Sequence, residues 1–338
     1  MVELARAPER IAVVQTERLG ELVFVSPLVR VLKLAWPKSL LTLVTRQEVV
    51  QLGACIPGVD AVLPLGGTWG WTGLVGLRAL ARSLQSPELV LVPEPTFRGG
   101  MLAWLSGAAT RVGTDASLNG RFFNVKVPVR PREPLVERWM DFARALGVEG
   151  PTELQLAPPT AEREKASQVL GSAPSIGLVL GADWPTKRWP LQLYVELGRR
   201  AAEAGLRPVL LGEPEDRPLA DAFLAQCEVP ALDLVGKGLL PTLSAMALLK
   251  GVCGGDAGWV HVARAVGTPT LLLFGPTDPG GHTLEYYAQA LRLGLDCQPC
   301  GDQAKKACPL KHQNCLKQLE VDRVWGALSS LLSRGGRR

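Results

Sequence analysis

The strongest constraint on the fold of this chain is a repeated alternation of short aliphatic runs with longer amphipathic segments. Short aliphatic runs between turn residues are typical of buried strands, and amphipathic segments are typical of helices. Alternation of this kind predicts parallel sheets covered by helices on both faces. In the first half we expect strands over 11–15, 40–44, 61–65, 88–92 and 123–129, and a long apolar-periodic, helical stretch over 21–36. Pro27 in this stretch is favourable in a first helical turn but would kink a helix that places it deeper inside.

The alternation restarts after a segment rich in Pro and small polar residues, 150–174. Here the pattern predicts strands over 175–181, 207–212, 231–236, 251–255 and 269–275, and helices over 191–204, 216–226, 241–250 and 258–266. A length of 338 residues also favours two hydrophobic cores. We therefore predict an α/β protein with two Rossmann-like domains: an N-terminal domain over 1–155, a linker over 156–174, a C-terminal domain over 175–320, and a C-terminal helix with a basic tail over 321–338.

Composition excludes several classes of protein. The chain is 47% hydrophobic and 20% charged, which excludes a disordered protein. No run approaches the ~18 apolar residues of a membrane span, and the first ten residues lack the apolar core of a signal peptide. We expect a cytoplasmic protein. Most of the net charge of +5 comes from one basic segment, 98–138, which either attracts anions or an anionic membrane surface or forms an ordinary solvated face.

The segment 254–261, Gly-Gly-Asp-Ala-Gly-Trp-Val-His, lies between an expected strand and an expected helix. Its small residues let the backbone approach a ligand, and the N-terminus of the next helix offers N–H groups that suit a phosphate. The alternative is a plain turn in which Asp256 caps the helix.

The segment 181–190, Gly-Ala-Asp-Trp-Pro-Thr-Lys-Arg-Trp-Pro, follows the first strand of the second half. Ligands bind at the carboxyl ends of strands in such sheets. Lys187 and Arg188 can balance a diphosphate, and Thr186 can donate a hydrogen bond to it. The alternative is cation–π packing of Trp184 and Trp189 on a surface loop.

The loop 16–21 has the corresponding place in the first half. A carboxylate on this loop can act as a general base, and Glu21 is the candidate for deprotonating an acceptor hydroxyl. Glu17 is its competitor on the same loop.

Taken in order, these segments resemble glycosyltransferase family 9, the heptosyltransferase family of bacterial lipopolysaccharide-core assembly. The resemblance spans residues 11 to 328, with TKRWP (186–190) and FGPTDP (274–279) as its most specific motifs. The segments that carry it are Val14–Glu21, Pro27-Leu28, Gly181–Pro190, Asp256–Gly258 with His261, Gly267–Pro269 and Phe274–Thr277.

The resemblance implies a GT-B fold, with two Rossmann-like domains facing across a cleft. It also implies inverting, metal-independent transfer of a heptose-like sugar from a nucleotide-sugar, most commonly ADP-linked, to a cell-envelope glycolipid or glycan. The family's catalytic aspartate falls on Glu21, which is a departure by one methylene, and the family's phosphate-neutralising lysine falls on Lys187. Gln15, Glu17 and Arg18 depart from the family's residues earlier in this loop.

The remaining site residues are carried over from the same resemblance. The donor-binding set is Thr186, Arg188, Glu215, Asp256, Ala257, Gly258 and His261, with Glu215 on the ribose. The acceptor-binding set is Arg18, Arg98 and Arg121. The expected partners are a nucleotide-sugar, an anionic glycolipid or glycan and, peripherally, the inner face of the cytoplasmic membrane; nucleic acid is not expected.

Four of the seven cysteines form one cluster in sequence: Cys297, Cys300, Cys308 and Cys315. They could supply four thiolates to a structural zinc, form disulfides or remain free. The other three, Cys55, Cys227 and Cys253, have apolar surroundings typical of a core. No cofactor is expected to be required for catalysis.

Three other functions compete with the transferase. A nucleotide-sugar epimerase on the same fold would return a free nucleotide-sugar, and a non-catalytic nucleotide-sugar-binding protein would bind the donor without turnover. A zinc-ribbon nucleic-acid binder is the most distant, since the basic residues are not interleaved with stacking aromatics.

Overall fold

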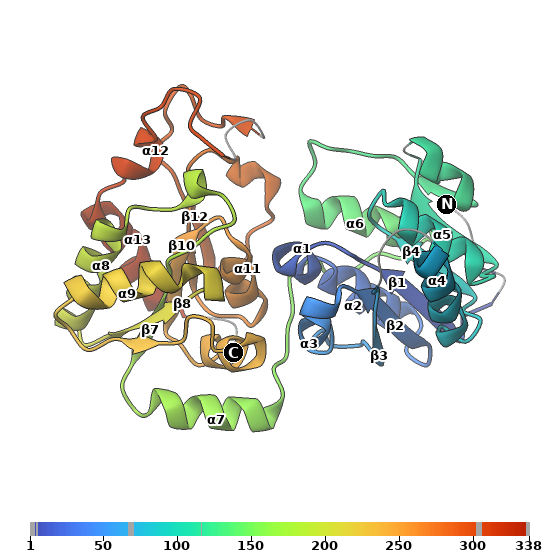
Figure 1. The fold of residues 1–338 in the computed structure, drawn as a ribbon, viewed down its shortest axis with the longest axis horizontal. Coiled ribbons are helices and arrows are strands. Elements are labelled where there is room, and N and C mark those ends of the chain that lie inside the picture. The colour runs from blue at the N-terminus through green and yellow to red at the C-terminus, as the bar shows by residue number, and fades with distance from the viewer. Residues whose placement is uncertain (1–3, 5, 67–70, 116, 302–305, 336–338) are drawn as a thin grey trace. The chain divides into compact units, whose positions relative to one another are not determined.

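The computed structural model describes residues 4, 6–66, 71–115, 117–301 and 306–335. The chain divides into two compact units, Met1–Ala157 with Gly281–Thr283, and Pro158–Gly280 with Leu284–Arg338 (Figure 1). Each unit is built on a six-stranded sheet in which neighbouring strands pair in parallel. The predicted class, α/β with two Rossmann-like parallel sheets, is confirmed.

The first sheet has the strand order β3-β2-β1-β4-β5-β6. Its strands are β1 Arg10–Val14, β2 Leu40–Thr45, β3 Ala61–Pro64, β4 Leu89–Val92, β5 Thr110–Thr114 and β6 Val125–Val127. β1 lies at the centre, in register with β2 from Arg10 opposite Leu40 to Val14 opposite Val44, and with β4 on its other side. The loops that follow β1 and β4 therefore leave the sheet side by side.

Helices cover both faces of the first sheet, with α2 and α6 on one face and α4 and α5 on the other (Figure 1). The helices of this unit are α1 Leu19–Val23, α2 Ser26–Ala35, α3 Val50–Gly53, α4 Trp71–Ser83, α5 Phe97–Leu105 and α6 Leu135–Arg144, with 3-10 turns η1 Gln47–Val49 and η2 Ser117–Phe122.

The helical stretch expected over 21–36 contains two helices, α1 and α2, and Pro27 lies in the first turn of the second. Pro27 in the first turn of α2 has no N–H, and its ring would clash with the carbonyl of Val23 in a continuous helix. That carbonyl instead accepts a hydrogen bond from Ser26 Oγ at 2.8 Å. The break separates α1, which carries Glu21, from α2.

The second sheet has the strand order β12-β11-β10-β7-β8-β9. Its strands are β7 Ser175–Val179, β8 Arg207–Leu211, β9 Leu232–Asp233, β10 Gly251–Gly255, β11 Thr270–Leu273 and β12 Ala288–Leu291. Two strands are additions to the predicted set, β12 here and β5 in the first unit. The central strands β7 and β10 are buried along their whole length, as expected for a sheet covered on both faces.

The helices of the second unit match the predicted positions closely, with α8 and α9 on one side of the sheet and α11 on the other (Figure 1). They are α7 Thr160–Leu170, α8 Leu191–Glu203, α9 Arg217–Gln226, α10 Leu239–Met246, α11 Gly258–Ala265, α12 Asn314–Lys317 and α13 Val321–Arg334, with 3-10 turns η3 Pro185–Lys187, η4 Pro214–Asp216 and η5 Pro279–Gly281.

Both ends of the predicted C-terminal domain differ from the structure. Most of the segment expected as a linker, 156–174, belongs to the second unit, where α7 packs against α10. The expected C-terminal helix is present as α13, but it is part of the same unit, since Val324, Leu328 and Leu331 lie in its core. The last residues of the predicted basic tail, 336–338, are outside the described residues.

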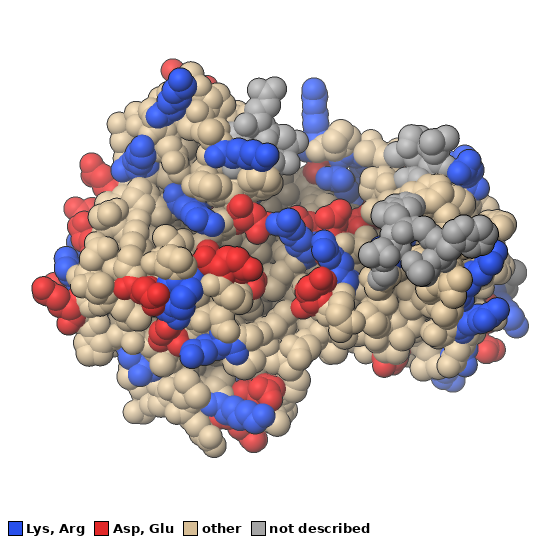
Figure 2. All heavy atoms as spheres, viewed as in Figure 1, with Lys and Arg blue, Asp and Glu red and all other residues tan. Residues whose placement is uncertain are grey.

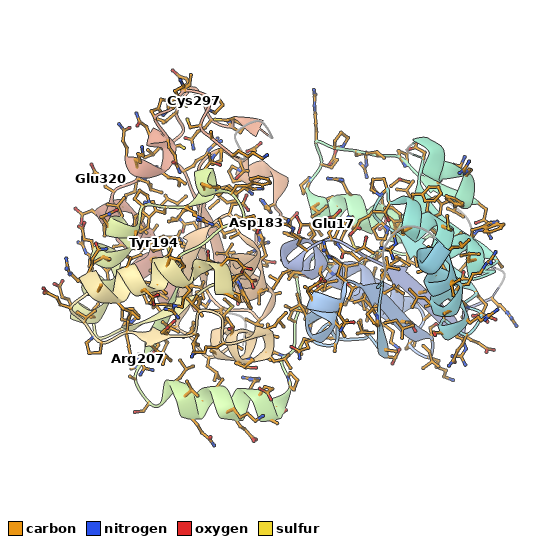
Figure 3. The ribbon with its side chains drawn as sticks, in the orientation of Figure 1. Glu17, Asp183, Tyr194, Arg207, Cys297 and Glu320 are labelled. Atoms are coloured by element: carbon orange, nitrogen blue, oxygen red, sulfur yellow. The ribbon has the colours of Figure 1, made fainter. Side chains whose placement is uncertain are left out.

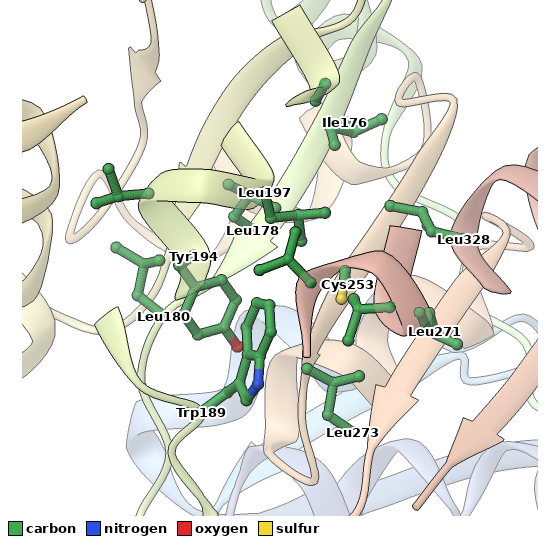
Figure 4. Packing of buried hydrophobic residues seen from close by; sticks show 14 of the residues in the cluster. Ile176, Leu178, Leu180, Trp189, Tyr194, Leu197, Cys253, Leu271, Leu273 and Leu328 are labelled. Carbon is green, nitrogen blue, oxygen red and sulfur yellow. The ribbon is translucent and has the colours of Figure 1, made fainter. Parts of the chain in front are cut away.

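The core of the second unit anchors the loop that follows β7. Trp189 is buried and stacks edge-on against Tyr194, with ring centroids 4.8 Å apart (Figure 4). Trp189 Nε1 donates to the carbonyl of Leu319 at 3.0 Å, and the Tyr194 hydroxyl donates to that of Val179 at 2.8 Å. These hydrogen bonds fix the end of a loop whose other residues reach the edge of the sheet.

Within the described ranges, none of the helices combines the length and the apolar character that crossing a bilayer requires.

Candidate functional site

Four loops of the second unit share the carboxyl edge of its sheet, because β11, β10, β7 and β8 are neighbours and run in parallel. Glycines let these loops touch. A Cβ on Gly255, at the end of β10, would overlap the carbonyl of Lys187, and one on Gly181, after β7, would overlap the Asp216 carboxylate. The loop after β7 is therefore packed directly against the ends of β10 and β8.

Lys187 and Asp256 form an ion pair at this edge. Lys187 Nζ lies 2.6 Å from Asp256 Oδ2, with side-chain exposures of 19% and 8%. Thr277, after β11, donates from Oγ1 to the same oxygen at 2.9 Å. Three loops thus converge on one carboxylate, and the lysine keeps a partly exposed ammonium at the edge.

The alternative interpretation of this turn, in which Asp256 caps α11, is wrong. The N-cap residue is Ala257, which makes no side-chain capping bond, and the helix begins at Gly258. Asp256 Oδ1 instead lies 3.3 Å from His261 Nε2. The Asp256 carboxylate therefore belongs to a network at the sheet edge. The N-terminus of α11 is formed by the backbone of Ala257 and Gly258.

His261 is buried, 4% exposed, and its other ring nitrogen faces Arg264 Nη1 at 3.1 Å. Burial lowers the pKa of His261, and the charges of Arg264 and Lys187 lower it further, while Asp256 raises it. The net direction is downward, so the imidazole is neutral at neutral pH.

The remaining donor-set residues lie on the same edge. Thr186 is buried in η3, beside Lys187. Arg188 donates from Nε to the carbonyl of Ala182 at 3.0 Å, and its Nη2 is 3.9 Å from Asp216 Oδ1. Glu215 is exposed in η4, directly after β8. All eight residues predicted from the second half to contact the donor therefore lie on the loops after β7, β8 and β10 or on the first turns of α11.

The cation–π alternative for the Trp-rich loop is not observed. Among the described residues, the cation–π contacts are those of Arg121 with Phe97 and Phe122. Trp189 is a core residue and does not pack against Lys187 or Arg188 on a surface loop.

In the first unit, the loop after β1 is bound by a carboxylate that the sequence reasoning missed. Glu94, after β4, is 5% exposed. It accepts hydrogen bonds from Thr16 N at 3.1 Å, Thr16 Oγ1 at 2.9 Å and Glu17 N at 3.1 Å. The signal was present, since β1 and β4 were both expected in one parallel sheet and Glu94 follows its strand almost at once.

Burial raises the pKa of Glu94 to about 7, although its hydrogen bonds with Thr16 and Glu17 lower it and the Glu17 charge raises it. Gln15 is fully buried beside it, and its Oε1 accepts from Glu17 N at 3.2 Å. The backbone of the loop after β1 is thus held by hydrogen bonds to the buried side chains of Glu94 and Gln15.

Glu21 and Arg18 lie at the start of α1, on the same loop. Arg18 is the N-cap residue, and Glu21 is in the first helical turn, where a carboxylate interacts favourably with the helix dipole. Both side chains are exposed, as is that of Glu17 (Figure 3). The loop therefore presents two carboxylates and one guanidinium to solvent.

Arg98 and Arg121 are brought close together by aromatic packing. Phe97 and Phe122 stack edge-on, with centroids 5.4 Å apart, and the Arg121 guanidinium lies 5.2 Å from the Phe122 ring centroid. Arg98, the next residue after Phe97, donates from Nη2 to the carbonyl of Gly66 at 2.5 Å. Two of the three predicted acceptor-binding cations thus share one neighbourhood at the start of α5.

Other cations of the basic segment have structural partners. Arg111 donates to the carbonyls of Phe122 and Ala108, and Arg130 pairs with Asp141. The surface drawn in Figure 2 accordingly shows acidic side chains among the basic ones. The charge of Arg130 is therefore balanced by Asp141, whereas Arg111 keeps its charge and is held in place by neutral carbonyls.

The cysteine cluster lies on an outer loop of the second unit, where Figure 3 labels Cys297. All four thiols are free, and Cys315 alone is buried. In the described part of this loop, no three sulfurs lie within 4.8 Å of one another. Burial raises the pKa of Cys308, but backbone N–H groups of residues 310–313 outweigh it and lower the pKa. The Cys308 thiol therefore ionises more readily than an ordinary cysteine.

Comparison with known proteins supports a single family. The model of glycosyltransferase family 9 (heptosyltransferase) matches residues 77–313. Lipopolysaccharide heptosyltransferase 1 of Pseudomonas aeruginosa is 28% identical, over 96% of this chain and 98% of the relative.

Solved structures agree in fold. The structure titled E. coli ADP-heptose lps heptosyltransferase II superposes with a TM-score of 0.82 at 22% identity, covering 96% of this chain and 99% of that one. A dodecameric iron-containing heptosyltransferase, TibC, gives a TM-score of 0.62 at 14% identity, covering 98% of this chain and 78% of that one. The GT-B fold expected from the sequence is confirmed by these neighbours, and the match to the family model over most of the chain means that the protein belongs to glycosyltransferase family 9.

Proposed function

We propose that the protein transfers a heptose from ADP-heptose to a lipopolysaccharide-core acceptor. Family membership and the names of the similar proteins support the reaction class. The observation that carries the proposal is the Lys187–Asp256 pair at the carboxyl edge of the second sheet, beside the N-terminus of α11. A cation and a helix N-terminus side by side form a site suited to a diphosphate.

The second unit would bind the nucleotide. The ammonium of Lys187 and the N–H groups of Ala257 and Gly258 would face the diphosphate, and Thr186 and Arg188 would add donors. Glu215, exposed after β8, would accept from the ribose hydroxyls. As the bond between the sugar and the β-phosphate breaks, negative charge grows on the departing ADP, so the contribution of Lys187 increases toward the transition state.

The first unit would bind the acceptor. Glu21 would take the proton of the attacking acceptor hydroxyl while its oxygen bonds to the sugar carbon and ADP leaves from the opposite face. This displacement inverts the configuration at that carbon. The guanidinium groups of Arg18, Arg98 and Arg121 would hold anionic groups of the acceptor, which we place at the inner face of the cytoplasmic membrane.

Transfer in this scheme requires no catalytic metal, because Lys187 and the α11 N-terminus supply the positive potential at the diphosphate. Two other functions compete with transfer on this fold: a nucleotide-sugar epimerase and a non-catalytic nucleotide-sugar-binding protein. A transfer assay separates them: incubation with ADP-heptose and a heptose-free core acceptor should yield ADP and a glycosylated acceptor.

We also propose that Cys297, Cys300, Cys308 and Cys315 bind a structural metal ion, zinc or iron. Burial raises the pKa of Cys315 to about 11, and the charges of Cys300, Cys308 and Cys297 add to the rise, so the four thiols are electrostatic neighbours. A bound cation would reverse that repulsion. The ion would stabilise this loop and take no part in transfer.

A further inference from the structure

A fully buried arginine stands behind the donor edge of the second unit. Arg264, on α11, has 0% exposure. Its Nε donates to Glu285 Oε2 at 2.9 Å, and the Glu285 side chain is 4% exposed. A buried guanidinium is costly unless it is paired and hydrogen-bonded, so its contacts with Glu285 and with His261 both matter.

The second contact constrains the chemistry of His261. Arg264 Nη1 lies 3.1 Å from His261 Nδ1, one helical turn earlier. A guanidinium has only donors, so Nδ1 must accept with its lone pair. A neutral imidazole carries one proton, which then resides on Nε2, where it can be donated to Asp256 Oδ1 at 3.3 Å. A proton on His261 Nδ1 would instead place an N–H donor against the N–H donor of Arg264 Nη1.

We propose that Arg264, held by Glu285, is a positioning residue that fixes His261 as the Nε2–H tautomer and thereby orients the Asp256 carboxylate. With Oδ1 taken by His261, Oδ2 is left to Thr277 and Lys187. The ammonium of Lys187 is then held at the sheet edge where, under the proposed function, the diphosphate binds. Arg264 acts through two residues and touches no substrate.

The framework around Arg264 is rigid. The Tyr287 hydroxyl donates to the backbone carbonyl of Arg264 at 3.2 Å, and Tyr287 is 2% exposed. α11 itself is buried at seven of its eight positions, including His261 and Arg264. The backbone of Arg264 is therefore held by the helix and by Tyr287, and its guanidinium is held by Glu285.

The test is the tautomer of His261, read by nitrogen NMR on the full chain labelled with 15N-histidine. The chain has three histidines, so a His261→Asn variant assigns the signal. We expect Nε2 protonated and Nδ1 bare in the wild-type protein at neutral pH. A proton on Nδ1 of His261 would overturn the proposal.

Removing the Arg264–Glu285 pair tests whether it fixes the tautomer of His261. The double variant Arg264→Met/Glu285→Gln leaves no unpaired buried charge, and its folding is checked by circular dichroism. We expect its His261 signal to lose the pure Nε2–H form and its affinity for ADP to fall roughly threefold to tenfold, the scale of one hydrogen bond. An unchanged tautomer and unchanged affinity in the folded double variant would contradict the proposal.

A matched control is the pair Arg200–Asp322, which joins α8 to α13 in the same unit away from His261. Arg200→Met/Asp322→Asn should leave the His261 signal and ADP affinity unchanged. Because the tautomer is read without nucleotide, its outcome is independent of the proposed donor. Should the double variant Arg264→Met/Glu285→Gln unfold, the single variant Arg264→Lys keeps the charge beside Glu285 but loses the planar fork of donors, and we expect it to fold with a mixed His261 tautomer.

Discussion

Lys187 Nζ and Asp256 Oδ2 lie 2.6 Å apart although 69 residues separate them in sequence. The contact exists because β7 and β10 are adjacent and a glycine at the end of β10 admits the backbone of Lys187. The acid holds the ammonium at the edge of the sheet before any ligand binds. A ligand with a stronger negative charge than one carboxylate can then share or take over that cation.

Lys187→Ala should weaken ADP binding and lower the rate of transfer. A charge-assisted hydrogen bond of this kind is worth about 1.5–3 kcal/mol, so we expect a loss of roughly tenfold to hundredfold in ADP affinity. Asp256 keeps its contacts with Thr277 and His261 in the variant, so the fold should persist. Calorimetric titration with ADP measures the effect.

The matched control for that titration is Lys165→Ala, which removes an exposed lysine on α7 that pairs with its helix neighbour Glu162. It should bind ADP as the parent does. An ADP affinity equal to the parent's in folded Lys187→Ala would remove this lysine from the site.

Glu21→Gln should abolish most transfer while leaving nucleotide affinity intact. Without a carboxylate the acceptor hydroxyl has no nearby group to take its proton, which typically costs ~10²–10⁴-fold in rate. The measurement is the initial rate of ADP release at saturating donor and acceptor. Glu17→Gln on the same loop is the control and should retain transfer.

Glu21→Asp restores the carboxylate that is usual in this family, one methylene shorter. We expect it to keep far more activity than Glu21→Gln, because the proton acceptor is retained and only its position changes. If Glu21→Gln is as fast as the parent and Glu17→Gln is slow, the base is Glu17 and our assignment is wrong.

Glu94 should make stability depend on pH between about 5 and 8. Its pKa rises from a usual 4.5 to about 7 on folding, so the folded state binds the proton more tightly than the unfolded state. The resulting stabilisation is full below pH 4.5 and is lost as the pH rises through 7, by at most about 3 kcal/mol.

Glu94→Gln removes this titration, so the wild type should lose stability relative to the variant between pH 5 and pH 8. Thermal melts of both proteins across this range measure the difference. Glu48→Gln, an exposed carboxylate in the same unit, is the control and should follow the wild type. Parallel curves for the wild type and Glu94→Gln would show that Glu94 ionises normally.

The cysteine loop should carry about one metal ion per chain when the protein is purified without chelator. Elemental analysis measures it, and Cys300→Ser and Cys308→Ser should each lower the content, since two of four thiolates come from this pair. Cys55→Ser, a buried core thiol in the first unit, should leave it unchanged. Metal-free wild-type protein with four reactive thiols would contradict the proposal.

The sequence was sufficient to locate the edges of the sheets and the motifs on them. The strand and helix pattern placed Lys187 and Asp256 on loops that follow strands, where ligands bind in parallel sheets. The adjacency of these two loops follows from the pairing of β7 with β10, which the sequence did not predict. The pattern also marked Pro27 as a point of strain, although the helix break there was not predicted. Weakly apolar strands such as β12, Ala-Gln-Ala-Leu, gave no periodic signal.

Buried polar partners were beyond the sequence argument. Glu94 and Arg264 look like surface charges, since carboxylates and guanidiniums are mostly exposed. Their burial depends on partners 78 and 21 residues away, Thr16 and Glu285, which only the folded chain brings together. Two sequence signals mark these residues: Glu94 comes almost directly after a buried strand, and Arg264 lies one helical turn after His261.

The most direct test of the proposed function is mass spectrometry of both substrates after incubation with the purified protein. With ADP-heptose and a heptose-free lipopolysaccharide-core acceptor, we predict that the acceptor gains one heptose residue and that one ADP is released for each transfer. Lys187→Ala should slow both products equally. An unmodified acceptor despite bound donor, or conversion of ADP-heptose into another free nucleotide-sugar, would contradict the assignment as a transferase.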